Sequence, residues 1–255
     1  MIKRIAALAY GVACYGVFFA TLLYAIGFLG NFGVPKSIDS GREGSTLAAL
    51  LIDGALLTIF ALQHSIMARP GFKRAWTRLV PEPVERSTYV LFSSLALLLL
   101  FWLWQPIGGV VWSVAPGWAA TAIFMLYATG LLIVLLSTFL INHFDLFGLR
   151  QVYLYFRGRD YTPLPFRTPF FYRYVRHPLY VGWLLTFWSA PVMTIAHLFF
   201  ATMTTAYILV AIRFEEADLV AFYGEKYLQY KKRVPMLIPA VPREEVSSTP
   251  RLRNA

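Results

Sequence analysis

The chain is dominated by long apolar runs that lack Lys, Arg, Asp and Glu. Residues 5–29 form the first run, and about 25 residues at ~1.5 Å each exceed the ~30 Å hydrocarbon core of a bilayer. Lys3 and Arg4 precede it, so a cleavable signal peptide is an alternative. The run is longer than the roughly 7–15 apolar residues of such a peptide, which favours a retained span. Residues 46–67 form a second span, interrupted by Asp53.

A longer charge-free stretch predicts two further helices. No Lys, Arg, Asp or Glu occurs from Ser87 to Phe144, which is room for two spans of about 20 residues with a turn between them. Proline and glycine cluster between residues 105 and 117 and mark that turn. We therefore expect helices at residues 88–104 and 118–141.

The last apolar run, residues 179–212, is too long for one straight span and carries Pro191 near its middle. It predicts a helix-turn-helix hairpin with helices at residues 180–190 and 195–213, and both ends of such a hairpin return to the same membrane face. Whether the hairpin crosses the whole bilayer is left open by the sequence.

Together these runs predict an all-α, polytopic membrane helix bundle. It has four full spans and the C-terminal hairpin, which makes five to six membrane segments. We divide the chain into a four-helix bundle at 1–141, a loop, hairpin and C-terminal segment at 142–242, and a disordered tail at 243–255.

Composition and charge support a membrane protein. Hydrophobic residues make up 58% and charged residues 14%, against about 25% charged in an average soluble domain. The net charge is +10, and the positive clusters alternate with neutral loops, which predicts cytoplasmic termini in an inner membrane and contact with membrane lipids. We expect no nucleic-acid partner and no obligate protein partner. The histidines lack metal-site spacing, so we expect no metal, and the single Cys14 excludes an internal disulfide.

Polar side chains are concentrated at the two ends of the predicted hairpin. Arg176, His177 and Pro178 open it, and Arg213 followed by Glu215-Glu216 closes it. Because a hairpin returns to its starting face, these groups should meet at one membrane interface. A polar loop of about 35 residues precedes them, and loops of that length are often functional.

These motifs resemble the signature of integral-membrane methyltransferases, which include isoprenylcysteine carboxyl methyltransferase and phospholipid N-methyltransferases. The resemblance covers residues 174–239, about a quarter of the chain. It rests on three ordered elements: Arg176-His177-Pro178-x-Tyr180-x-Gly182, then Glu215-Glu216-x-x-Leu219, then Gly224-x-x-Tyr227-x-x-Tyr230 with Val234-Pro235 and Ile238-Pro239.

Two upstream segments look like the bacterial methanethiol S-methyltransferase branch, which is related to the NnrU-like membrane proteins. They are residues 61–70, which contain His64, and residues 142–151, which contain His143 and Asp145. This resemblance implies S-adenosylmethionine as cofactor, held in a cytoplasmic pocket, a small thiol as substrate and dimethyl sulfide as product.

The resemblance also implies a set of cofactor-binding residues. An Arg suits the cofactor's carboxylate, since its fork donates paired hydrogen bonds, and a Glu suits the ammonium group or the ribose hydroxyls. Gly182 would allow a close approach. The residues carried over are Arg176, His177, Pro178, Tyr180, Gly182, Glu215, Glu216 and, more weakly, Tyr230.

Methyl transfer to a thiol needs alignment, exclusion of water and a thiolate nucleophile. A base would help to form the thiolate, and an imidazole beside a carboxylate titrates in the useful range. The catalytic candidates are His143 with Asp145, His64 opposite them, Gln151 to orient the thiol, and Arg213. Structural alternatives remain: His64 as a helix-end hydrogen bonder, His143 and Asp145 as loop anchors, and Arg213 as an interfacial charge.

Three functions are therefore compared. The leading one is S-adenosylmethionine-dependent methylation of a small thiol. A second keeps the cofactor but methylates a prenylcysteine carboxylate or a lipid amine. The third is a non-enzymatic, NnrU-like membrane protein.

Overall fold

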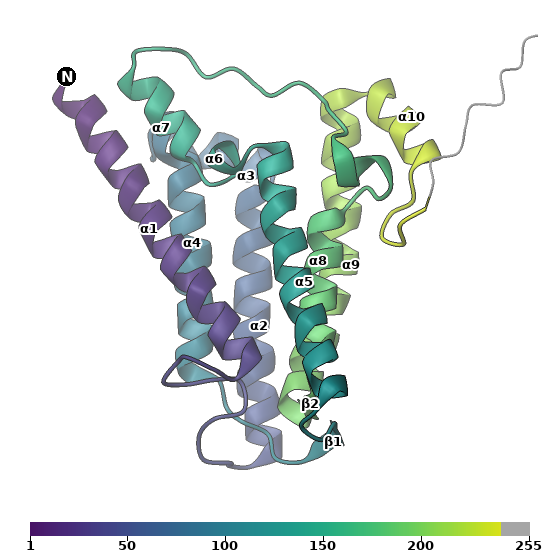
Figure 1. Ribbon diagram of the computed structural model, residues 1–255. Helices are drawn as coiled ribbons and strands as arrows, with labels where there is room; N and C mark the ends of the chain where they lie inside the picture. The colour runs from purple at the N-terminus through teal and green to yellow at the C-terminus, as the bar shows by residue number, and fades with distance from the viewer. Residues whose placement is uncertain (241–255) are drawn as a thin grey trace, which may run out of the picture.

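The protein is represented by a computed structural model, of which residues 1–240 are described; the tail predicted to be disordered at 243–255 lies outside the described residues. Five helices are long and apolar enough to cross a membrane and run along one common direction (Figure 1). They are α1 (Ile2–Gly30), α2 (Thr46–Ala68), α4 (Glu82–Leu103), α5 (Trp118–Ile141) and α9 (Ile195–Tyr223). The all-α membrane bundle predicted from the sequence is confirmed.

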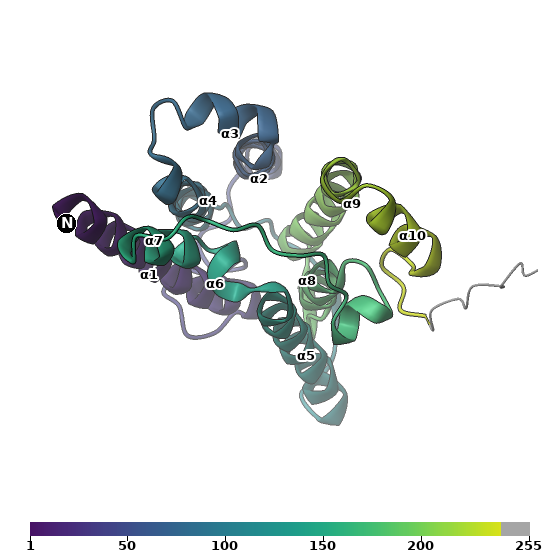
Figure 2. The same cartoon turned by 90° about the horizontal axis from the view of Figure 1, so that it is seen from above.

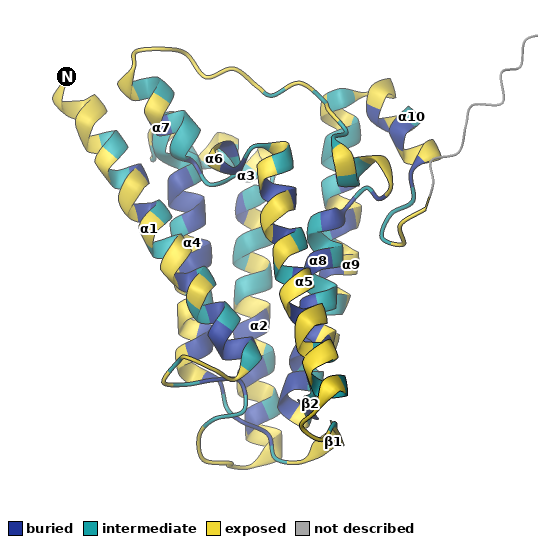
Figure 3. Ribbon diagram, viewed as in Figure 1, coloured by how far each residue is buried: buried dark blue, intermediate teal, exposed yellow. Residues whose placement is uncertain are grey.

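The outer surface of these helices is apolar, as a lipid-facing surface requires. Figure 3 shows exposed residues along the outer faces of α1 and α5, and they include large apolar side chains such as Leu23 and Leu132. The inner faces carry an aromatic core in which Phe28 packs on Phe101 and Trp104. An apolar exterior around a packed interior is the arrangement expected in a bilayer.

Short helices occupy the connections at one end of the bundle (Figure 2). The predicted loop 142–176 contains three of these short helices, because a turn follows each of its short apolar stretches. These elements are α3 (Pro70–Trp76), α6 (His143–Leu146), α7 (Leu149–Phe156), the 3-10 helix η1 (Phe170–Arg173) and α10 (Glu225–Arg233).

The C-terminal hairpin forms as predicted, with unequal arms. Helix α8 (Pro178–Trp188) has 11 residues, about half the length needed to span a bilayer. The chain then forms β2 (Val192–Thr194), which pairs antiparallel with β1 (Val110–Ser113), and α9 returns. Helix α9 ends at Tyr223, well beyond the predicted Arg213, because the charged residues after Ile212 end the apolar run but still favour a helix. The two-stranded ribbon is too short to be read from sequence.

Helices α5 and α8 approach each other closely through two glycines. A Cβ atom on Gly182 would lie 2.7 Å from the carbonyl oxygen of Gly130, and a Cβ atom on Gly130 would lie 2.7 Å from the carbonyl oxygen of Gly182. Small residues allow such contacts between membrane helices. The close approach expected at Gly182 is therefore made by a neighbouring helix.

Candidate functional site

Four side chains form an ionic cluster around the buried carboxylate of Glu216, and we call this cluster the clamp. Arg176 and His177 come from the segment that precedes α8, Glu216 from α9 and the partly exposed Lys231 from α10. The Nε of Arg176 donates to Oε1 of Glu216 at 2.7 Å, and Nε2 of His177 lies 3.1 Å from the same oxygen. The Nζ of Lys231 lies 2.7 Å from Oε2. The Glu216 side chain is only 6% exposed, and a carboxylate so far removed from water needs such partners. The two ends of the hairpin therefore meet, as the sequence predicted.

The local sequence explains how these residues are brought together. Pro178 is the first residue of α8 and is fully buried, so His177 precedes the helix in a non-helical conformation. Gly224 has a φ of 60° between α9 and α10, a conformation that glycine adopts readily. The resulting turn brings α10 back against α9 and directs Lys231 to Glu216.

The segment after α10 pairs with the backbone that precedes α8. The backbone N–H of Arg176 donates to the carbonyl of Pro235 at 2.9 Å, and that of His177 to Met236 at 3.2 Å. Tyr230 donates its hydroxyl to the carbonyl of Tyr172 at 2.6 Å. The Tyr230 ring packs on Phe166, and burial raises the pKa of its phenol. Tyr230 thus holds the segment in place, and its cofactor contact stays a prediction.

The neighbouring Glu215 has a different environment from Glu216. Its side chain is 41% exposed. It accepts a hydrogen bond of 2.8 Å from the hydroxyl of Tyr180, and Nδ1 of His177 lies 3.9 Å away. Glu216 is saturated by the clamp, whereas Glu215 still presents carboxylate oxygen to a ligand. Among the residues predicted to bind the cofactor, Glu215 is therefore the most accessible acid.

The structure separates the predicted pair His143 and Asp145. Nε2 of His143 lies 2.7 Å from the Tyr15 hydroxyl, and Nδ1 lies 2.8 Å from Oγ1 of Thr138. Asp145 instead accepts from Nη1 of Arg150 at 2.9 Å. The expected imidazole–carboxylate contact is wrong, because both residues lie on the short helix α6 two positions apart and such positions do not face each other. Burial lowers the pKa of His143, so it is neutral near pH 7.

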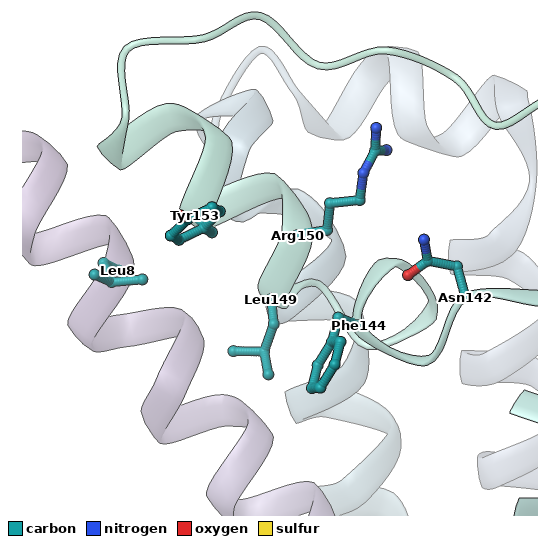
Figure 4. Close-up of a pocket in the computed structure, with 6 residues that line it drawn as sticks. All are labelled: Leu8, Asn142, Phe144, Leu149, Arg150 and Tyr153. Atoms are coloured by element: carbon teal, nitrogen blue, oxygen red, sulfur yellow. The ribbon is translucent and has the colours of Figure 1, made fainter. Parts of the chain in front are cut away.

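Gln151 lies beside this segment on α7. Its Nε2 donates to the carbonyl of Asp145 at 3.1 Å, and its buried Oε1 has no partner within residues 1–240. A pocket of about 430 Å³ opens next to it between α1, α6 and α7 (Figure 4). The pocket is lined by Leu8, Asn142, Phe144, Leu149, Arg150 and Tyr153. None of the clamp residues reaches it.

His64 faces a different part of the bundle from His143. The Tyr89 hydroxyl lies 3.0 Å from its ring nitrogens, and Oγ of Ser93 lies 3.2 Å from Nδ1. Phe60 stacks on the His64 ring and also contacts Tyr207 on α9, the helix that carries Glu215. His64 therefore belongs to a polar group on the Glu215 side. His143 contacts α1 and α5 instead.

The remaining candidate, Arg213, is exposed on α9 and has no partner within residues 1–240.

Sequence reasoning missed two contributors, Tyr89 and Lys231. Tyr89 and Ser93 are four residues apart in a charge-free run, so they share one helix face, and that spacing is a usable signal. Lys231 belongs to the basic last turn of α10, and its sequence neighbours carry no comparable signal. No group of three or more His, Cys, Asp or Glu residues gathers as a metal site in the part of the chain that the structure describes.

Comparison with known proteins identifies the family. The chain is 62% identical over 240 residues, 94% of both chains, to methanethiol S-methyltransferase from Crocosphaera subtropica. It is 53% identical to methanethiol S-methyltransferase 1 from Bradyrhizobium diazoefficiens, over 93% of this chain and 84% of the relative. The Mycobacterium tuberculosis methanethiol S-methyltransferase is 49% identical, over 93% and 97%. The chain belongs to the methanethiol S-methyltransferase family.

Membership in this family confirms the resemblance drawn from the sequence motifs, and with it a membrane-embedded methyltransferase. No protein-family model matches the chain, and no solved structure matches it. The non-enzymatic reading is not favoured by these relatives. The clamp and the accessible Glu215 are therefore the candidate site for the family's chemistry in this chain.

Proposed function

We propose that this protein transfers a methyl group from S-adenosylmethionine to methanethiol and releases dimethyl sulfide. One observation carries the proposal: in a chain of this family, the hairpin sets an accessible carboxylate, Glu215, directly beside the clamp, whose buried Arg176 has one guanidinium nitrogen, Nη2, without a partner within residues 1–240. This arrangement suits a ligand that carries both an ammonium and a carboxylate group. The names of the relatives support the thiol as acceptor.

The residues at the clamp fit the proposed cofactor chemically. Glu215 offers an acceptor for an ammonium group or ribose hydroxyls, and Tyr180 orients it. Arg176 uses Nε and Nη1 for Glu216 and for backbone carbonyls, while its Nη2 has no partner within residues 1–240 and can donate to a carboxylate. When bound, S-adenosylmethionine would supply an electrophilic methyl carbon: as the thiolate sulfur bonds to this carbon, the bond to the sulfonium sulfur would break and leave S-adenosylhomocysteine, a neutral thioether.

The protein's own side chains have separate roles in the proposed reaction. Glu216 and Lys231, together with Nε and Nη1 of Arg176, hold the wall of the site, and only Nη2 of Arg176 is left to bond a ligand. His64 is the preferred base for the thiol proton, since Phe60 and Tyr207 connect it to α9, the helix that carries Glu215. The proton passes from the thiol sulfur to a ring nitrogen. His143 is the second choice. Exclusion of water by the surrounding apolar helices favours the displacement.

We also propose that the clamp end of the bundle faces the cytoplasm of a bacterial inner membrane. The N-terminus and α10 lie at this same end (Figure 1). It carries the basic residues before α1, between α2 and α4, and around α10. Membrane proteins retain Lys and Arg preferentially on the cytoplasmic side, and this rule supports the proposed orientation.

The test uses the full chain purified in detergent with methyl-labelled S-adenosylmethionine and methanethiol. Labelled dimethyl sulfide in the headspace, measured by gas chromatography, is the expected result. Extraction of lipids from the same reaction after adding membrane lipid checks the other acceptor class. Label found in the lipid fraction and none in dimethyl sulfide would assign the activity to a prenylcysteine or lipid amine acceptor instead.

A further inference from the structure

A small crevice lies between α2 and α9, inside the membrane-spanning part of both helices. It measures about 70 Å³ and is lined by Leu57, Thr58, Phe60, Ala61, Met203, Thr204 and Tyr207. Leu57 is buried and forms its floor, whereas Thr58 and Met203 are exposed and border its mouth. The mouth therefore opens at bilayer depth, towards lipid rather than towards water.

The crevice walls are apolar despite two threonines. Oγ1 of Thr58 donates to the carbonyl of Gly54 at 2.7 Å, and Oγ1 of Thr204 donates to the carbonyl of Phe200 at 2.6 Å. Both hydroxyls are thus satisfied within their own helices, and the threonines offer mainly methyl surface to the crevice. An uncharged ligand of low polarity is the chemistry that such walls accept.

The end of the crevice nearest the clamp is polar. The Tyr207 hydroxyl lies 3.0 Å from Oγ of Ser65. Phe60 contacts Tyr207 on one side and stacks on His64 at a centroid distance of 5.3 Å on the other. The crevice therefore leads towards the His64 group, and Glu215 is eight residues further along α9 from Tyr207, about 12 Å at ~1.5 Å per residue.

The volume selects the size of the ligand. A cavity of about 150 Å³ holds benzene with its six heavy atoms, which is about 25 Å³ per heavy atom. A crevice of about 70 Å³ therefore holds roughly three heavy atoms. Methanethiol and dimethyl sulfide meet this limit. Only a small part of a prenyl group or an acyl chain fits inside the crevice.

We infer that the α2–α9 crevice is an intramembrane docking site for a small, uncharged thiol on its way to the clamp. The inference rests on the proposed function and adds the route by which the acceptor arrives. A simple thiol is mainly protonated near pH 7 and so partitions into the bilayer. It then meets the first polar groups, Tyr207 and His64, only after leaving the lipid.

The first test is independent of turnover and uses xenon as the probe. Crystals of the full chain under xenon pressure should show anomalous density between Ala61 and Met203, because xenon enters small apolar cavities. The same density should be lost in Ala61→Phe. A wild-type crevice without xenon overturns the inference.

The second test measures the thiol requirement of the purified enzyme. Ala61→Phe should raise the KM for methanethiol at least tenfold, with kcat at saturating thiol within twofold of wild type. The matched control is Leu62→Phe on the exposed face of the same helix, which should change neither value. An unchanged KM in Ala61→Phe overturns the docking site.

A third variant keeps the inference testable if Ala61→Phe does not fold. Met203→Ala enlarges the crevice and should raise the rate with butanethiol relative to methanethiol at least fivefold. The control is Leu209→Ala, exposed on the same helix, which should leave this ratio unchanged. If Met203→Ala gives the same ratio as this control, the result counts against the site. Failure of the proposed function looks different, because wild type then forms no dimethyl sulfide, and the xenon crystal alone decides on the crevice.

Discussion

The two ends of the helix bundle both bury polar side chains, but they use them differently. At the end that carries the β-ribbon, polar groups bond to backbone. Oδ1 of Asp53 accepts from the N–H of Gln105 at 2.9 Å, Nε1 of Trp104 donates to the carbonyl of Ile38 at 3.0 Å, and Nε2 of His197 donates to the carbonyl of Phe187 at 2.9 Å. The first two contacts fix loops against helices, and the third joins α9 to α8.

At the clamp end, polar side chains from the segment before α8, from α9 and from α10 bond to one another. Glu216 contacts Arg176, Lys231 and the imidazole of His177, while Glu215 beside it retains exposed carboxylate surface. An ionisable residue in a membrane segment is a functional candidate by default. The comparison teaches that the surroundings of each acid decide. Asp53 is fully buried, with Oδ1 bonded to a backbone group and Oδ2 without a partner within residues 1–240, whereas the clamp leaves the half-exposed Glu215 accessible to a ligand.

The largest expected effect comes from breaking the clamp. Glu216→Ala leaves Arg176 buried without its carboxylate, and removal of one partner from a buried pair costs about 3–5 kcal/mol. Methyl transfer should be lost together with the fold of the hairpin. Thermal unfolding in detergent measures this, with exposed Glu225→Ala as the control. A stable, active Glu216→Ala enzyme would show that the clamp is dispensable.

The next effect concerns catalysis without loss of stability. Glu215→Gln removes a charged acceptor worth about 1.5–3 kcal/mol, so kcat/KM for S-adenosylmethionine should fall about 10- to 100-fold. The unfolding temperature should hardly change, because Glu215 is half-exposed. The matched control is Asp218→Asn. Asp218 lies on the same helix as Glu215 and pairs at the surface with Arg69. Equal kinetics in the two variants would argue against a cofactor role for Glu215.

Substitution of Asp53 at the β-ribbon end should lower stability without changing catalysis. Asp53→Leu leaves the Gln105 N–H without its acceptor, and an unsatisfied buried donor costs about 1–3 kcal/mol. We expect a lower unfolding temperature with unchanged kcat and KM, and a smaller loss in Asp53→Asn, whose amide oxygen still accepts. A stable Asp53→Asn protein with much reduced kcat would make Asp53 a functional residue after all.

The smallest expected effect is on pH dependence. Burial lowers the pKa of His143, so its neutral form persists as the pH falls through about 6.5, the ordinary histidine value. If His143 accepts the thiol proton, the acid limb of kcat should lie below that value and disappear in His143→Asn. Profiles measured with saturating methanethiol decide this. Identical acid limbs in the two proteins would leave His64 as the base.

The candidate site was predicted better at the hairpin than at the upstream histidines. Arg176 and Glu216 could be brought together from sequence, because Pro191 divides an apolar run that is too long for one span. His143 and Asp145 looked like a pair because they are close in sequence, yet α6 directs them apart to Tyr15 and Arg150. Sequence proximity is a poor guide on a short helix.

The sequence by itself determined the spans, the hairpin and the family motifs, since apolar run length and charge position follow directly from the cost of placing polar groups in lipid. Only the tertiary structure decided which of two adjacent acids is saturated, that Lys231 closes the clamp and that Gly182 serves helix packing against Gly130. These outcomes depend on helix rotation and on contacts between distant segments. A one-dimensional pattern contains neither.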